Sequence, residues 1–149
     1  MATIAVTLRQ NRWLLGSLAF AGKTVPCLAI SDNGYAAEEG NPTRDPLKPG
    51  GDLPTGTYRC QIVPPGDPVH SYGPGRRLLI QGIEGDALKA MAVRSGLMVH
   101  GGDLNPAYKQ WGGLRPTHGC LRLADEDVAW LVGLLDGVDD VEMVVSEAA

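Results

Sequence analysis

Glycine and proline interrupt this chain so often that long helices are excluded from most of it. The 149 residues include 20 glycines and 11 prolines, spread along the sequence. Glycine weakens the interior of helices and strands, and proline ends them, so both residues mark turns between short elements. This punctuation favours many short strands joined by turns over a bundle of helices.

Apolar and alternating runs predict strands over residues 3–8, 23–30, 57–63, 77–83, 96–100 and 141–145, with turns near residues 10–11 and 21–22. The long segment 31–56 consists mostly of turn-forming residues, with a short helix expected around residues 35–39. Residues 64–75 are expected to form a loop, and a weak helix is expected over 85–92. Only residues 124–137 have a clear 3.6 period, with an acidic first turn and apolar Val128, Leu131, Val132 and Leu135. The length suits one domain over residues 1–149, mainly β with one main helix near the C-terminus.

Charge and hydropathy narrow the classes of partner. The formal net charge is −4 and the basic residues are scattered, so no basic stripe predicts a nucleic-acid partner. No stretch approaches the roughly 20 apolar residues of a transmembrane segment. Residues 9–23 have the basic start and short apolar run of a signal peptide, but we favour a strand hairpin there because a strand already precedes them.

The three cysteines, Cys27, Cys60 and Cys120, are odd in number and lack any short spacing. They predict neither a disulfide framework nor a zinc knuckle, although a disulfide between Cys27 and Cys60 stays open. Cys120 differs from the others because it follows Thr117, His118 and Gly119 directly.

A cysteine becomes a nucleophile as the thiolate, which needs a nearby base or positive charge. His100, at the end of a predicted strand, and His118, two residues from the thiol, are both candidates for that base. Gly119 lets the backbone turn tightly, so the amides of Gly119 and Cys120 are expected to form an oxyanion hole. A buried structural thiol and a zinc site made by the two imidazoles and the thiol are the alternatives.

Two motifs resemble the L,D-transpeptidase (YkuD-type) catalytic domain. His100 is followed by sixteen residues and then by Thr117-His118-Gly119-Cys120, an apolar residue and Arg122, which is similar to the family's catalytic signature. Residues 53–58 resemble a second family segment, with leucine at the position where threonine is usual. The resemblance covers roughly residues 3–123 in the same order.

The resemblance implies a mixed sheet bent into a sandwich or partial barrel, and it assigns roles to the motif residues. Cys120 would be the nucleophile and His100 the general base, oriented by the main-chain carbonyl of Gly101. His118 would line the pocket. The remaining expected roles are the oxyanion hole at Gly119 and Cys120, the Ser/Thr position at Thr117, and Arg122 as a residue that fixes the motif loop or binds a substrate carboxylate.

The implied substrate is a peptidoglycan stem tetrapeptide, with no cofactor and no metal. The thiol would form a thioester on the third stem residue, and an amine of a second stem, water or a free D-amino acid would resolve it. Carbapenem acylation of the same cysteine is also implied. Tyr108, Trp111 and Arg115 lie between the two catalytic segments and are expected to bind substrate as a lid, unless the aromatic residues anchor the loop instead.

Three functions therefore stay open. The first is a cell-wall or periplasmic transpeptidase, exported by another route or with a leader outside this sequence. The second is an antibacterial toxin of the same family with carboxypeptidase or exchange activity, which would have a secretion-system or immunity partner. The third is a non-catalytic protein that binds wall peptides or zinc.

Overall fold

A computed structural model describes residues 2–148, which form one eight-stranded sheet with few helices. The order of the strands is β3-β2-β1-β8-β4-β5-β6-β7. The pairs β1–β8 and β6–β7 are parallel and the other neighbours are antiparallel. The strands are β1 (Ala2–Arg9), β2 (Gly16–Phe20), β3 (Lys23–Cys27), β4 (Gly56–Val63), β5 (Arg77–Glu84), β6 (Met98–His100), β7 (Leu121–Arg122) and β8 (Val141–Ala148). The predicted mainly-β fold with a mixed sheet is confirmed.

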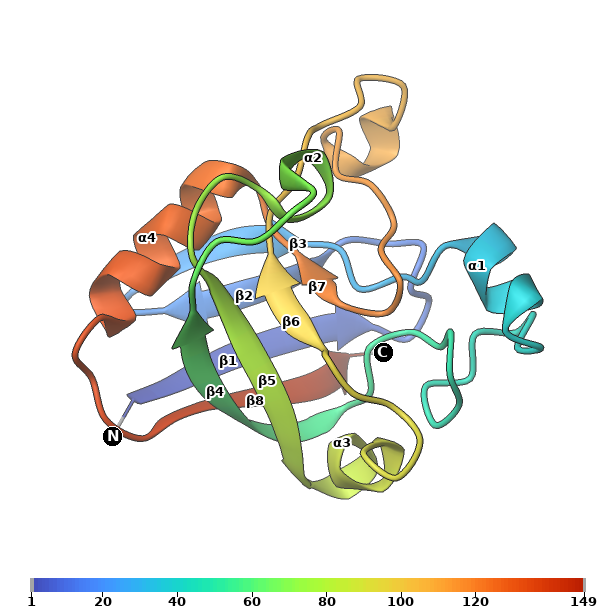
Figure 1. Ribbon diagram of the computed structural model, residues 1–149, viewed down its shortest axis with the longest axis horizontal. Helices are drawn as coiled ribbons and strands as arrows, with labels where there is room; N and C mark the ends of the chain where they lie inside the picture. The colour runs from blue at the N-terminus through green and yellow to red at the C-terminus, as the bar shows by residue number, and fades with distance from the viewer. Residues whose placement is uncertain (1, 149) are drawn as a thin grey trace.

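The sheet curls until its two edges meet. Figure 1 shows β1, β2 and β3 passing behind β5, β6 and β7. Beyond the end of β3, Leu28 and Arg122 exchange two backbone hydrogen bonds of 3.0 Å each, and Ser31 forms a bridge with Thr117. The segment 28–31 therefore closes the sheet into a partial barrel and lies directly against the predicted catalytic motif.

Alternation along the strands fills the interior of this barrel. Ile4, Val6 and Leu8 of β1 are buried, and the parallel register places Met143 and Val145 of β8 beside Ile4 and Val6. Side chains at every second position of a strand share one face, so these residues build one apolar core. Tyr58, on β4, is fully buried in the same core, and its hydroxyl donates to the Pro54 carbonyl at 2.5 Å. Residues 53–58, the second segment that resembles the family, thus anchor the start of β4 in the core through Tyr58.

Five short or medium helices surround the sheet: α1 (Asn33–Glu38), α2 (Val69–Tyr72), α3 (Gly85–Ala90), the 3₁₀ turn η1 (Lys109–Trp111) and α4 (Asp125–Leu135). All four predicted core positions of α4 are buried. None of the helices within residues 2–148 is long and apolar enough to cross a membrane. The three cysteines are free, so the disulfide between Cys27 and Cys60 that the sequence allowed is not formed in this structure.

One local expectation was wrong: residues 64–75 were expected to be loop throughout, but residues 69–72 form α2, which has no hydrophobic period that would predict it. The first turn lies at residues 10–11 as expected and extends to residue 15, because β2 begins only at Gly16. A Cβ at residue 16 would collide with the Thr7 carbonyl and Leu8, so glycine is required where the second strand begins.

Candidate active site

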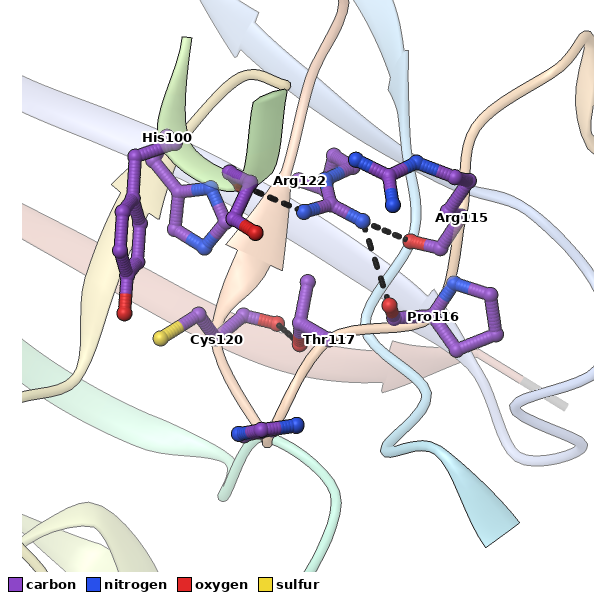
Figure 2. Close-up of a pocket in the computed structure, with 9 residues that line it drawn as sticks. His100, Arg115, Pro116, Thr117, Cys120 and Arg122 are labelled. Atoms are coloured by element: carbon purple, nitrogen blue, oxygen red, sulfur yellow. Dashed lines mark hydrogen bonds between the residues drawn. The ribbon is translucent and has the colours of Figure 1, made fainter. Parts of the chain in front are cut away.

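His100 and Cys120 face one cavity at the junction of β6 and β7. The parallel pairing places Val99 beside Leu121 and His100 beside Arg122, so the residue that ends β6 meets the residues that begin β7. Figure 2 shows the imidazole and the sulfur on the same side of this junction. The cavity holds about 180 Å³ and is lined by Ser71, Tyr72, His100, Arg115, Pro116, Thr117, His118, Cys120 and Arg122.

The protonation of His100 follows from its contacts. Its Nδ1 lies 2.7 Å from the carbonyl oxygen of Gly101, the contact that the resemblance implied. A carbonyl only accepts, so Nδ1 carries the proton and Nε2 keeps a free lone pair. Burial, together with the charges of Arg122 and Arg77, lowers the pKa of His100 to about 4 although the Gly101 hydrogen bond opposes the shift. At neutral pH the side chain is therefore an uncharged base.

Cys120 is also uncharged at rest. Its side chain is only 8% exposed, and its sulfur lies 4.0 Å from the Gly96 carbonyl oxygen. Burial raises the pKa of the Cys120 thiol, against the opposing effects of the Met98 backbone and of Arg94, Arg122 and Arg77. The thiolate must therefore form during reaction, by transfer of the proton to a nearby base, rather than exist beforehand as half of an ion pair.

The predicted oxyanion hole needs a correction. The Gly119 amide donates to the Thr117 hydroxyl at 3.0 Å, and that hydroxyl donates to the Cys120 carbonyl at 3.0 Å. Thr117 therefore holds the turn together, and the Gly119 amide is engaged within the turn instead of being free for an oxyanion. In the described part of the chain the Cys120 amide donates to no protein acceptor, so of the two expected donors only this amide is free.

Arg122 fixes the loops around the cavity. Its side chain is buried and donates to four carbonyl oxygens: Nε to Gly101 at 3.0 Å, Nη1 to Arg115 at 2.7 Å and Pro116 at 3.2 Å, and Nη2 to Ser71 at 2.6 Å. Figure 2 shows the bonds to Arg115 and Pro116 as dashed lines. The Gly101 carbonyl thus accepts from both His100 and Arg122. Of the two roles expected for this arginine, the structure supports fixing the loop, because its donors are occupied by backbone.

Arg115 and His118 form the more open rim of the cavity. Arg115 is half-buried, with Nε donating to the Asp103 carbonyl at 2.6 Å and Nη2 donating to the His70 carbonyl. His118 is exposed and stacks on Tyr35 of α1 with ring centroids 3.8 Å apart. His118 lines the pocket as the sequence suggested, and its ring is held by α1.

The predicted lid residues Tyr108 and Trp111 do not line the cavity. Trp111 is 2% exposed in a small cluster with Leu28, Ile30 and Leu114, and Tyr108 packs on that cluster. The Trp111 indole also donates to the Trp13 carbonyl at 2.7 Å. These aromatic residues anchor the loop 101–116, which was the alternative interpretation.

Sequence reasoning missed three residues of the cavity, Ser71, Tyr72 and Pro116. Ser71 and Tyr72 come from α2, the helix that the sequence did not predict, and the Tyr72 ring meets the His100 ring edge-on at 5.0 Å. Nothing in residues 64–75 distinguishes these two side chains from ordinary loop residues. Within residues 2–148 no three His, Cys, Asp or Glu side chains are grouped to hold a metal, so the zinc alternative has no geometric support.

Comparison with known proteins identifies the family of this chain. The sequence model described as "YkuD: L,D-transpeptidase catalytic domain" matches residues 34–143, well over half of the chain. The chain belongs to this family. A search of curated protein sequences finds no match.

Solved structures show that the fold is shared. The L,D-transpeptidase of Mycobacterium tuberculosis is 14% identical, with a TM-score of 0.51, covering 97% of this chain and 57% of that one. The cell shape determining protein Pgp2 of Campylobacter jejuni is 17% identical, with a TM-score of 0.52, covering 98% and 48%. Bdellovibrio bacteriovorus Bd1075 is 13% identical, with a TM-score of 0.53, covering 95% and 46%. This L,D-transpeptidase domain therefore spans about half the length of these structures.

Proposed function

We propose that the protein is a peptidoglycan L,D-transpeptidase in which Cys120 is the nucleophile and His100 the general base. The observation that carries the proposal is the shared cavity at the β6–β7 junction, which is lined by a thiol and by an imidazole whose Nδ1 is held by Gly101 and whose Nε2 lone pair is free. A thiol beside a positioned base is the minimal apparatus for acyl transfer. Membership of the L,D-transpeptidase family supports the choice of wall peptide as substrate.

In the proposed first step, the Cys120 proton moves to His100 Nε2 while the sulfur bonds to the carbonyl carbon of the third stem residue. The Cys120 amide stabilises the resulting oxyanion. When the intermediate collapses, the bond to the terminal D-alanine breaks and its nitrogen takes the proton from the imidazolium. A thioester remains on Cys120, and an amine, water or a D-amino acid then attacks it, giving its proton to His100 and returning the thiol.

Charge in the cavity suits a carboxylate-bearing peptide. The nine described residues of the lining include two arginines and no Asp or Glu. Arg122 is occupied by backbone carbonyls, whereas Arg115 is half-buried at the rim and donates only through Nε and Nη2 in this structure. Arg115 is therefore the residue that we expect to hold a carboxylate of the stem peptide, by a charge-assisted hydrogen bond.

Mass spectrometry of muropeptides after incubation tests this function directly. Wild-type protein is expected to remove the terminal D-alanine of tetrapeptide stems, with dimers, tripeptides or exchanged stems as products according to the acceptor. Intact protein mass is expected to show a carbapenem adduct at Cys120. Cys120→Ala is the matched control and should do neither. Unchanged muropeptides and no adduct on folded wild-type protein would contradict the proposal.

The acidic limb of the pH profile is a second test. Because His100 must be uncharged to accept a proton and its pKa is lowered to about 4, kcat/KM should persist as the pH falls from 7 to about 5 and be halved near 4. A base with the ordinary histidine pKa of about 6.5 would already be half protonated at a pH of about 6.5. Initial rates on a tetrapeptide stem give the profile, and circular dichroism at each pH controls for unfolding. Half-loss of activity near pH 6.5 would show that the buried neutral imidazole is not the base.

A further inference from the structure

A buried arginine outside the family motifs lies behind the nucleophile. Arg94 belongs to the connection between α3 and β6, and only 7% of it is exposed. Its guanidinium donates to three carbonyl oxygens, those of Pro46 at 2.7 Å, Asp52 at 2.8 Å and Gly51 at 3.0 Å. The ion pairs found within residues 2–148 do not include Arg94. Its positive charge is therefore solvated by carbonyl dipoles, and the Asp52 carboxylate, which pairs with Arg44, favours the charged form of Arg94 without forming an ion pair with it.

The guanidinium touches the turn that carries Cys120. Gly119 has a φ of +105°, and a Cβ at this position would overlap Arg94 Nη2 and the Gly51 carbonyl oxygen. Glycine is required at residue 119 partly because the guanidinium occupies the space of a side chain. The same α3–β6 connection supplies the Gly96 carbonyl beside the Cys120 sulfur. Arg94 and the thiol are thus neighbours across the Gly119 backbone.

The charges that face the thiol come from three elements. Arg94 lies in the α3–β6 connection, Arg122 in β7 and Arg77 in β5, and each favours the thiolate, Arg94 most strongly. His100 faces the thiol from β6 and is uncharged at rest. Arg122 is withdrawn toward carbonyls on the His100 side of the cavity. Arg94 is therefore the charge that supports the thiolate from the side away from the base.

We propose that Arg94 is a positioning residue that stabilises the Cys120 thiolate through the Gly119 turn, and that the loop of residues 44–52 serves to hold its guanidinium there. The proposal rests on Cys120 being the nucleophile of the proposed function. It gives the long connection between β3 and β4 a chemical role, because three of that loop's carbonyls fix a cation behind the thiol. An opposite charge within about 4–6 Å of a group favours its ionised form by about one pKa unit or more.

Alkylation by iodoacetamide across a range of pH measures the thiol directly and needs no turnover. Arg94→Gln removes the charge and is expected to raise the thiol pKa by about one unit, which slows alkylation at neutral pH about tenfold. Arg94→Lys keeps the charge on a shorter side chain that withdraws it from Gly119, so we expect about a threefold slowing. Arg76→Gln is the matched control, since it removes an equal charge from an exposed arginine. Cys120→Ala gives the background from Cys27 and Cys60.

Each outcome decides the proposal. A thiol pKa that rises in Arg94→Gln and, by less, in Arg94→Lys, but not in Arg76→Gln, supports it. An unchanged thiol pKa in a folded Arg94 variant overturns it and leaves Arg94 with a structural role only. If Arg94→Gln does not fold, Arg94→Lys decides by the same criterion. Because alkylation does not depend on wall peptides, a shifted thiol pKa without muropeptide turnover would retain this inference while the proposed function failed.

Discussion

His100→Gln is expected to lower kcat/KM on tetrapeptide stems by about 10²-fold to 10⁴-fold with little loss of stability, the range for removal of a positioned general base. The glutamine amide still donates to the Gly101 carbonyl as the His100 Nδ1 does at 2.7 Å, so the contact that shapes the end of β6 is retained. What disappears is the lone pair of Nε2. With a buried thiol whose pKa is raised, little thiolate forms without that base.

His70→Gln is the matched control, because His70 is an exposed histidine whose side chain does not line the cavity. Its backbone carbonyl, which accepts from Arg115, is unchanged by the substitution. Initial rates of D-alanine release and the thermal midpoint should be measured for both variants. Loss of activity in the His70 variant comparable to that in the His100 variant, or a His100 variant within tenfold of wild type, would remove His100 from the mechanism.

The two catalytic residues should also behave as one unit. Nucleophile and base act in the same step, so the effects of removing them do not add. His100→Gln combined with Cys120→Ala is expected to be no slower than Cys120→Ala alone. A further decrease in the double variant would mean that His100 contributes to binding, and KM measured for the His100 single variant would separate that effect.

Local sequence patterns were enough to predict the class of the fold and the candidate reacting groups. Alternation in residues 2–9 and 141–148 and the 3.6 period of α4 each reflect burial of one face, which is a local property of the chain. The catalytic motif is local as well, because Gly119 and Cys120 form a turn whose shape depends on adjacent residues. The parallel pairing of β6 and β7, which brings His100 to that turn, was not predicted: resemblance to the family proposed His100 as the base but said nothing of how the two strands pair.

The parts that sequence could not supply depend on pairs of segments far apart in the chain. Arg94 belongs to no periodic pattern in the sequence. Its proposed role follows only from the folded structure, in which carbonyls from residues 46–52 accept its hydrogen bonds. Tyr72 reaches His100 from a helix without a hydrophobic pattern. The hydrogen bond from the Gly119 amide to the Thr117 hydroxyl is different, since it is local. The prediction assigned this amide to the oxyanion hole and overlooked the Thr117 hydroxyl as its acceptor.

Arg122→Ala is expected to destabilise the fold by about 3–5 kcal/mol, the range for removing one partner from a buried charged network. Its guanidinium links three segments through the carbonyls of Ser71, Gly101, Arg115 and Pro116. Without it, Gly101 would keep only its contact with His100 and the other three carbonyls would lose this donor. Burial lowers the pKa of Arg122 only to about 10, so the side chain is charged at neutral pH. For a domain of this size such a loss lowers Tm by about 10 °C.

The identity of the residue at this position matters beyond its charge. Arg122→Lys keeps a cation but cannot donate to four carbonyls spread around a planar fork, so we expect most of the loss in Tm to remain. Arg76→Ala is the control, because its exposed pair with Asp136 is worth no more than about 1 kcal/mol. Differential scanning calorimetry measures all three. A fall in Tm for Arg122→Ala no greater than that for Arg76→Ala would mean that solvent replaces the guanidinium. The Gly101 carbonyl would then be held by His100 alone, and the rigidity of the base would have to come from its packing against Tyr72.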